Sequence, residues 1–190
     1  MFDALSDLNV FTSITAVGSG GADALSEGLS CNQEALRLTD LGDYIGAERQ
    51  HKRVIQVKES SLPKYHTSIG ISYNGLGEVY ILMNRLDNAE HYLLPAIELR
   101  KTNGPIMDLA ISRDNLGKVY EMRGDLAKAR EIRLQDAPNN MCCSNYTCTG
   151  IMQVPLSRLS RCGKCKSIFY CSQKCQSVDW KRHKKYCRQQ

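Results

Sequence analysis

The sequence has no uninterrupted apolar run of the ~18 residues that a membrane-spanning helix requires. Residues 1–10 carry two aspartates and no lysine or arginine, whereas a secretory signal begins with basic residues. The sequence also offers no group of serine, histidine and carboxylate residues that is typical of nucleophilic catalysis. These absences predict a protein that stays inside the cell and has no membrane partner.

Cysteine is nearly absent from the first 140 residues, where Cys31 is the only one, although the chain contains nine. Because the inside of a cell is reducing, disulfides are disfavoured there, and metal ligation is the usual reason for a dense group of cysteines. The odd total also fits poorly with a closed set of disulfides. The end of the chain therefore predicts metal binding, whereas Cys31 is expected to be a small buried apolar side chain.

An internal repeat runs through the residues before the cysteine-rich segment. A shift of forty residues aligns Leu-Gly-Glu-Val-Tyr at residues 76–80 with Leu-Gly-Lys-Val-Tyr at residues 116–120. A weaker copy lies at residues 41–48. The apolar spacing around these motifs is helical, so the repeat predicts a series of helices over residues 30–136.

Each repeat is expected to form a hairpin of two closely packed helices. The first helix should end at Asn84 or Gly124, because both residue types tolerate the positive φ that closes a helix. Small residues occupy the positions where the helices must approach each other: Gly77, Gly117, Ala47, Ala89 and Ala129. The pattern Leu-Gly-x-x-Tyr, with an alanine nine residues after the tyrosine, resembles the tetratricopeptide repeat, in a variant with longer helices. The resemblance implies a helical-hairpin solenoid; a helical bundle without repeats is the alternative.

Two residues depart from this pattern, and the resemblance also implies a binding groove. Pro95 lies inside the second helix of its unit, where it is expected to kink the helix. Arg133 occupies a position that is usually apolar. Repeats of this kind bind a segment of another protein in a concave groove built from their first helices. The groove residues are expected to be Ile71, Asn74, Glu78, Asp114, Lys118 and Glu121.

Eight potential metal ligands lie in four closely spaced pairs near the end of the chain. The pairs are Cys143-x4-Cys148, Cys162-x2-Cys165, Cys171-x3-Cys175 and His183-x3-Cys187. Structural zinc takes four such donors in a tetrahedron, whereas catalytic zinc keeps one position open. Eight donors therefore predict two closed sites. Cys142 is adjacent to Cys143 and is the alternative ligand at the first position.

The spacing resembles the MYND finger, and the resemblance extends to the residues around the ligands. These are Tyr170-Cys171-Ser172, Cys175-Gln176, Asp179-Trp180 and His183-Lys184. The first pair departs from the family, which usually has Cys-x2-Cys there. In this family the pairs interleave, which implies one zinc ion on Cys143, Cys148, Cys171 and Cys175 and a second on Cys162, Cys165, His183 and Cys187. Metal binding is then expected to supply most of the folding free energy, on the order of 10 kcal/mol or more per site.

Members of the MYND family use the positions that match Gln176 and Trp180 to hold short proline-containing peptides, so the resemblance implies a peptide-binding surface there. The alternative for Trp180 is a hydrophobic plug beneath the zinc sites. His183 is expected to be a ligand because Cys187 follows at ligand spacing on a short helix at residues 178–186. Three other histidines have no such partner and are expected to be ordinary helix residues: His51, His66 and His91.

Two alternative functions remain. Residues 158–190 hold ten Lys/Arg against the single acid Asp179, and such a basic tail can bind nucleic acid. The tail lacks a continuous basic stripe with interleaved aromatic residues, which disfavours that alternative. The other is a fragment or relative of a SET-type lysine methyltransferase, since some of those enzymes carry a MYND finger. The repeat-helical front of the chain and its end three residues after Cys187 disfavour this reading.

The sequence thus predicts a mainly α chain with four parts. Residues 1–29 are expected to be a loosely ordered lead-in, residues 30–136 the helical repeats, residues 137–142 a linker and residues 143–187 a cross-braced two-zinc finger. We interpret the chain as a non-catalytic adaptor in which the repeats and the finger each bind a protein segment. Because a linker separates the two parts, removing the metal is expected to unfold the finger and to leave the repeats largely intact.

Overall fold

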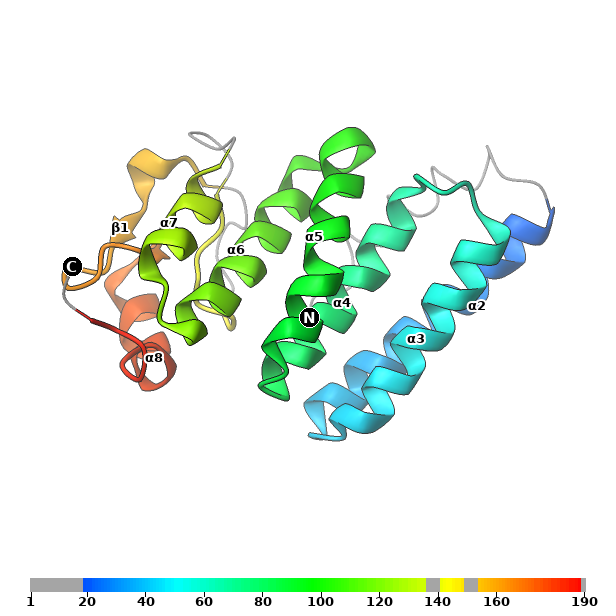
Figure 1. Ribbon diagram of the computed structural model, residues 1–190, viewed down its shortest axis with the longest axis horizontal. Coiled ribbons are helices and arrows are strands. Elements are labelled where there is room, and N and C mark those ends of the chain that lie inside the picture. The colour runs from blue at the N-terminus through cyan, green and yellow to red at the C-terminus, as the bar shows by residue number, and fades with distance from the viewer. Residues whose placement is uncertain (1–18, 136–140, 149–153, 189–190) are drawn as a thin grey trace.

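A computed structural model of the chain describes residues 19–135, 141–148 and 154–188. The first of these ranges forms a row of helices that lie side by side along the molecule (Figure 1). They are α2 (Ser19–Asp40), α3 (Tyr44–Ser61), α4 (Thr67–Leu82), α5 (Leu86–Asn103), α6 (Ile106–Arg123) and α7 (Leu126–Leu134). None of the helices in the described ranges has the length and apolar content needed to cross a membrane.

The helices pair as three hairpins, α2–α3, α4–α5 and α6–α7, that share one turn. The turn residue has positive φ each time: 80° at Gly42, 56° at Asn84 and 86° at Gly124. In every turn the next residue donates its N–H to the carbonyl oxygen five residues earlier, which closes the first helix in a Schellman motif. Asp43 and Asp125 then cap the second helices of the outer hairpins. The predicted helix ends at Asn84 and Gly124 are confirmed.

Small residues allow the two helices of a hairpin to approach each other. Ala47, Ala89 and Ala129 are fully buried. A Cβ atom added to Gly77 would lie 2.6 Å from Cγ of Leu93, closer than packed atoms can approach. The repeat therefore depends on these positions having little or no side chain.

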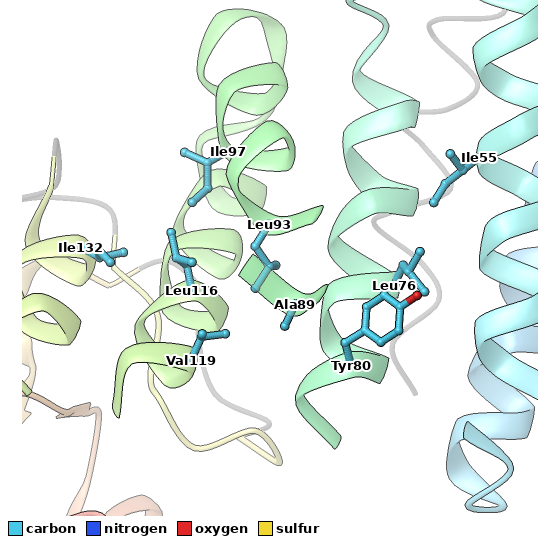
Figure 2. Close-up of a cluster of buried hydrophobic side chains, with 9 residues drawn as sticks. All are labelled: Ile55, Leu76, Tyr80, Ala89, Leu93, Ile97, Leu116, Val119 and Ile132. Carbon is cyan, nitrogen blue, oxygen red and sulfur yellow. The ribbon is translucent and has the colours of Figure 1, made fainter. Parts of the chain in front are cut away.

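One apolar core runs through successive hairpins rather than filling each one separately (Figure 2). Its members are Ile55, Leu76, Tyr80, Ala89, Leu93, Ile97, Leu116, Val119 and Ile132. These residues come from α3, α4, α5, α6 and α7, so each hairpin covers its neighbour. This is the packing of a repeat solenoid, and the predicted fold class is confirmed.

Polar contacts between successive hairpins also repeat. The Tyr80 hydroxyl donates to Glu48 of the preceding hairpin at 2.9 Å, and Tyr120 donates to Glu90 in the same way. At the other end of the helices, buried Lys58 donates to Ser72 of the next hairpin at 2.9 Å and to the carbonyl oxygen four residues before it.

Arg100 repeats the Lys58 contact one hairpin later. It donates to Ser112 and to the carbonyl oxygen four residues before that serine. The repeat is therefore encoded in paired polar side chains as well as in the Leu-Gly-x-x-Tyr motif. This second signal was not predicted from the sequence, because lysine and arginine are rarely buried and normally indicate an exposed helix face.

The first hairpin begins earlier than expected. Residues 19–29 belong to α2, although residues 1–29 were expected to form a loose lead-in. Leu25 explains the difference, because it is 1% exposed and packs against Leu62 and Ile69, which lie far along the chain. Cys31, expected to be buried, is only partly so.

Among Pro95 and the three histidines placed in helices from the sequence, only His66 differs from expectation. Pro95 lies inside α5, which continues past it to Asn103. His66 is not inside a helix but at the N-cap of α4, where its Nδ1 accepts the N–H of Ser68. His51 is 4% exposed within α3, whereas His91 lies on the surface of α5.

The cysteine-rich segment adds a small body beside α6 and α7 (Figure 1). Its elements are the short η1 (Leu156–Arg158), β1 (Ser160–Arg161), β2 (Phe169–Tyr170) and α8 (Gln173–His183). β1 and β2 pair antiparallel, with Ser160 opposite Tyr170, and a bridge joins Met141 to Val154. Met141 was expected to lie in a linker at residues 137–142, but it is buried in this body.

His51 generates a prediction about pH. Burial, with the Lys58 charge as a smaller cause, lowers the pKa of His51 from 6.5 to about 4. In the unfolded chain His51 is protonated near pH 6.5, whereas in the folded chain it is protonated only near pH 4. The free energy of unfolding therefore falls as the pH drops through this window. Between roughly pH 7.5 and pH 5 this effect costs about 2 kcal/mol.

Replacing the histidine should remove that cost. The free energy of urea unfolding of His51→Leu should fall less between the two pH values than that of the unaltered protein, by about 2 kcal/mol. His91→Leu, which changes an exposed histidine, should behave like the unaltered protein. Equal pH dependence in all three proteins would contradict a neutral buried His51.

Candidate metal centre

The structure brings the eight predicted ligands together in two groups of four. Cys143, Cys148, Cys171 and Cys175 form the first group, and Cys162, Cys165, His183 and Cys187 form the second. Within each group the ligand atoms all lie within 4.8 Å of one another. The groups interleave along the chain, so each site ties together two segments that are distant in sequence.

The distances within the groups fit tetrahedral zinc. Zn–S bonds of about 2.3 Å in a tetrahedron place the sulfur atoms about 3.8 Å apart. Cys148 and Cys171 have their Sγ atoms 3.6 Å apart, and those of Cys162 and Cys187 are 3.8 Å apart. Nε2 of His183 lies 3.4 Å from Cys162 Sγ. These separations exclude disulfide bonds, in which the sulfur atoms are about 2.05 Å apart.

Without a cation, the donors of the second group would not all be ionised. Burial raises the pKa of Cys162, but backbone N–H groups of Cys165 and Lys164 outweigh it and lower that pKa to about 7. Burial and the neighbouring Cys165 raise the pKa of Cys187 to about 12. The group therefore cannot hold all of its sulfur atoms as thiolates by itself. A bound Zn²⁺ would supply the charge that keeps them deprotonated.

Helix α8 presents one ligand to each site from a single face. Ser172 caps the helix by accepting the N–H of Cys175 at 3.2 Å, so the helix starts and ends earlier than the predicted 178–186. Cys175, Asp179 and His183 follow at intervals of four residues and are buried. This spacing places a ligand of the first site and a ligand of the second on the same side of α8.

The motif residues Tyr170 and Asp179 support this helix. The Tyr170 hydroxyl donates to Oδ2 of Asp179 at 2.8 Å, and both side chains are buried. Arg182 donates to the same carboxylate through Nε and Nη2. Together these bonds fix α8 against β2, which ends at Tyr170 immediately before the ligand Cys171.

Four residues separate the first two ligands, Cys143 and Cys148, where the MYND family usually has two. This longer loop faces the solenoid. Ser144 is fully buried and donates to Asp114 of α6 at 2.7 Å. Asn145 shapes the turn by accepting the N–H of Thr147 at 3.3 Å. Cys142 points away from the ligands and lies 3.5 Å from the carbonyl oxygen of Ala110. The geometry therefore favours Cys143 over Cys142 as the first ligand.

The second site has a partner outside the finger. Nδ1–H of His183 donates to Oε1 of Glu121 on α6 at 2.8 Å, and neither side chain is exposed. Glu121 also accepts from Arg133 at 3.0 Å and from Arg182 at 2.9 Å. Burial raises the pKa of Glu121, but His183, Arg133 and Arg182 outweigh it and lower that pKa to about 2. The carboxylate is thus held in its charged form.

Arg133 lies at the centre of a buried ion network between α6, α7 and the finger. It stands opposite Gly117 as Leu93 stands opposite Gly77 in the preceding hairpin. Its Nε donates to Asp114 at 2.8 Å, and Nη1 reaches the carbonyl oxygen of Ser167 in the finger at 3.2 Å. The polar residue in an apolar position of the repeat is therefore explained by the carboxylates and by the docked finger.

Four of the six expected groove residues are buried and do not face a groove. Asp114, Lys118 and Glu121 are 5%, 7% and 0% exposed, and they bind one another or the finger instead of facing a groove. Lys118 also lies under the ring of Tyr146, 5.3 Å from its centroid. Asn74 is buried too, and Ile71 and Glu78 are partly buried. The finger therefore covers the part of the first-helix face that α6 contributes.

Gln176 and Trp180 lie on α8 one turn apart. Trp180 is 40% exposed and Gln176 is partly buried. The indole ring stands edge-on to the His183 ring, with 5.7 Å between the centroids. Trp180 is thus partly exposed, with one edge against a ligand of the second site and the rest facing solvent.

Comparisons with family models identify both parts of the chain. The model of the MYND finger matches residues 141–187, and a model of the tetratricopeptide repeat matches residues 71–105. The combination expected from the sequence is confirmed. Both are modules that generally mediate protein–protein interaction, and the finger implies zinc binding.

Curated relatives match over a short stretch only. N-lysine methyltransferase SMYD2-B of Xenopus laevis is 59% identical over 29 residues, and N-lysine methyltransferase SMYD2 of Homo sapiens is 55% identical over 29 residues. Each match covers 15% of this chain and 7% of the relative. The chain thus spans a small part of these relatives, in their MYND region, and no enzymatic domain is matched.

The ion network generates a prediction about stability. Arg133→Leu restores the usual apolar residue of the repeat, but it leaves Asp114 and Glu121 without their shared buried cation. Because Lys118 and Arg182 then neutralise these two buried carboxylates only in part, the variant should lose about 3 kcal/mol or more of unfolding free energy. Urea unfolding in the presence of zinc measures this loss.

The matched control is Lys128→Leu on the same helix. Lys128 is 42% exposed and pairs only at the surface with Glu131, so its replacement should change the free energy by less than about 0.5 kcal/mol. A variant Arg133→Leu as stable as this control would show that the network does not hold α7 in place.

Proposed function

We propose that the chain is a non-catalytic, zinc-binding adaptor. Its finger holds two zinc ions and binds short proline-containing peptide segments through Gln176 and Trp180, and its helical repeats bind a second protein segment. The observation that carries this proposal is the closure of both ligand groups. Each offers four protein donors at distances suited to one tetrahedral zinc ion, and a tetrahedron filled by protein leaves no position for a substrate.

The proposed ligands are the eight residues that form the two groups. Zinc supplies cross-linking of the finger there, in place of a large apolar core. The cluster between the finger and α7 is small and consists mostly of the ligands themselves, with Leu126, Ile168 and Tyr170. A body of this kind needs metal to remain folded.

Metal content tests the assignment. The purified protein, prepared without chelator, should contain two zinc ions per chain by elemental analysis. Cys142→Ala should retain both ions, because Cys142 points toward Ala110, whereas Cys143→Ala should lose the first site. One ion or none in the unaltered protein would contradict the two-site assignment. Loss of an ion from Cys142→Ala but not from Cys143→Ala would show that Cys142 is the first ligand.

The peptide surface is proposed for the solvent side of α8. Trp180 is 40% exposed there, and Gln176 lies one turn before it on the same face of the helix. An exposed indole beside an amide suits a proline ring and a peptide backbone. The finger carries the only tryptophan of the chain, so its fluorescence reports on this surface alone.

Binding of synthetic proline-containing peptides tests the surface. Titration followed by tryptophan fluorescence should saturate for the unaltered protein. In calorimetry, Trp180→Ala should weaken binding by about 2 kcal/mol or more, the size of a binding hot spot. Gln176→Ala should weaken it less, with both zinc ions retained.

The control is Tyr65→Ala, which removes a 66% exposed aromatic residue outside the finger and should bind as the unaltered protein does. The surface is wrongly assigned if zinc-replete Gln176→Ala and Trp180→Ala also bind every peptide as tightly as the unaltered protein. A loss of zinc from Trp180→Ala would instead favour the plug alternative, since the indole edge covers His183.

The methyltransferase alternative rests on the MYND finger and on the names of the curated relatives, and on no other feature of the described residues. Those residues form helices, one two-stranded pair and two closed ligand groups. Transfer of a methyl group from S-adenosylmethionine to lysine by the purified chain would favour that alternative. Nucleic-acid binding is also disfavoured, because Arg182 of the basic tail is committed to Asp179 and Glu121.

A further inference from the structure

We propose that Glu121 is a positioning residue of the second metal site, and that this site is shared between the finger and the third helical hairpin. The ligand His183 lies in the finger, but the acceptor of its Nδ1–H lies on α6, 62 residues earlier. The proposal rests on the assignment of Cys162, Cys165, His183 and Cys187 as a zinc site. It adds that the solenoid completes this site.

The imidazole orientation supports this role. Nε2 of His183 faces the sulfur atoms, 3.4 Å from Cys162 and 3.5 Å from Cys165, whereas Nδ1 faces Glu121 at 2.8 Å. A carboxylate at Nδ1 fixes the proton there, which leaves Nε2 as the lone pair for the metal and prevents rotation of the ring. Outer partners of this kind change metal affinity roughly 10- to 100-fold.

Glu121 is itself held rigidly. It is 0% exposed, so water cannot replace it, and Arg133 and Arg182 bind its two oxygen atoms at 3.0 Å and 2.9 Å. Arg133 comes from α7 and Arg182 from α8, so the carboxylate joins three helices at the histidine ligand. A carboxylate in this position can orient the ring more strictly than a surface residue could.

The first site has a parallel tether. Ser144, next to the ligand Cys143, donates to Asp114 on α6, and Asp114 in turn accepts from Arg133. Both ligand groups therefore connect to the same two helices through buried polar bonds. The repeats and the finger were expected to fold independently, but these bonds predict otherwise. The stability of α6 and α7 should depend on the metal, whereas that of α3, which lies two hairpins away, should not.

Cobalt(II) titration of the full chain tests the role of Glu121. Cobalt bound to four sulfur atoms and cobalt bound to three sulfur atoms and one nitrogen absorb differently, so the two sites are read separately. Glu121→Ala should weaken the second site roughly 10- to 100-fold and leave the first site unchanged. Glu121→Gln keeps an oxygen that can accept from Nδ1–H, and it should recover part of the loss.

The control for the titration is Asp114→Asn, which disturbs the same buried network through Arg133 and Ser144 rather than through His183 or Glu121. A merely structural role of Glu121 predicts that this variant weakens the second site as much as Glu121→Ala, which would overturn the proposal. If the unaltered protein fails to show a three-sulfur, one-nitrogen site, the ligand assignment itself is wrong. If it shows that site but Glu121→Ala binds cobalt there as tightly, only the role of Glu121 is wrong.

Hydrogen exchange of the unaltered protein tests the shared site even where a variant does not fold. Removal of metal with EDTA should speed amide exchange at least tenfold in α6 and α7 as well as in the finger, while α3 keeps its protection. Unchanged exchange in α6 and α7 with a fully deprotected finger would show that the solenoid is independent of the metal. That result would overturn the proposal.

Discussion

The attachment of the finger to the solenoid depends on one buried carboxylate. Glu121 has no exposed surface, and an isolated charge at such a position would be costly, so its partners are required rather than optional. Arg133, Arg182 and His183 supply the required donors at 2.8–3.0 Å, and they come from a repeat helix and from the finger. The repeats and the finger consequently cannot separate without exposing or unpairing this group, and their relative position is fixed by it.

The same docking solves a problem that every solenoid has at its end. The last repeat presents an apolar face that a further repeat would cover, and without a cap this face is open to aggregation. In this chain the finger takes that place: Leu126 packs with Ile168 and Tyr170, and Leu134 packs against Met141 and Phe169. The finger in turn lacks a core of its own, so the apolar surface of α7 serves both bodies.

Local patterns in the sequence predicted much of this, and contacts across the chain account for what they missed. The turns at Asn84 and Gly124 and the forty-residue register depend on neighbouring residues, and they were predicted. The ligand pairs were predicted from spacing, and the structure brings them together as two groups. The start of α2 was missed because Leu25 is buried by residues far along the chain. The burial of Asp114 and Glu121 was not predicted, because the finger that covers them lies further along the sequence. The one local indication was Arg133, a cation in a position that is usually apolar, which pairs with both carboxylates.

The docked finger also changes what the repeats can bind. Without the finger, the third hairpin would present Asp114 and Lys118 to a partner. In the structure Ser144 of the finger binds Asp114, and Tyr146 of the finger contacts Lys118, so the finger takes the place of a bound segment. These two residues of α6 are therefore not available to a partner of the repeats. The indole of Trp180 meets the ring of His183, and His183 meets Glu121, so the solvent side of α8 connects to α6 through two contacts. A zinc ion on His183 would act on both of these contacts, so we expect loss of metal from the second site to disturb the solvent side of α8 and the end of the solenoid together.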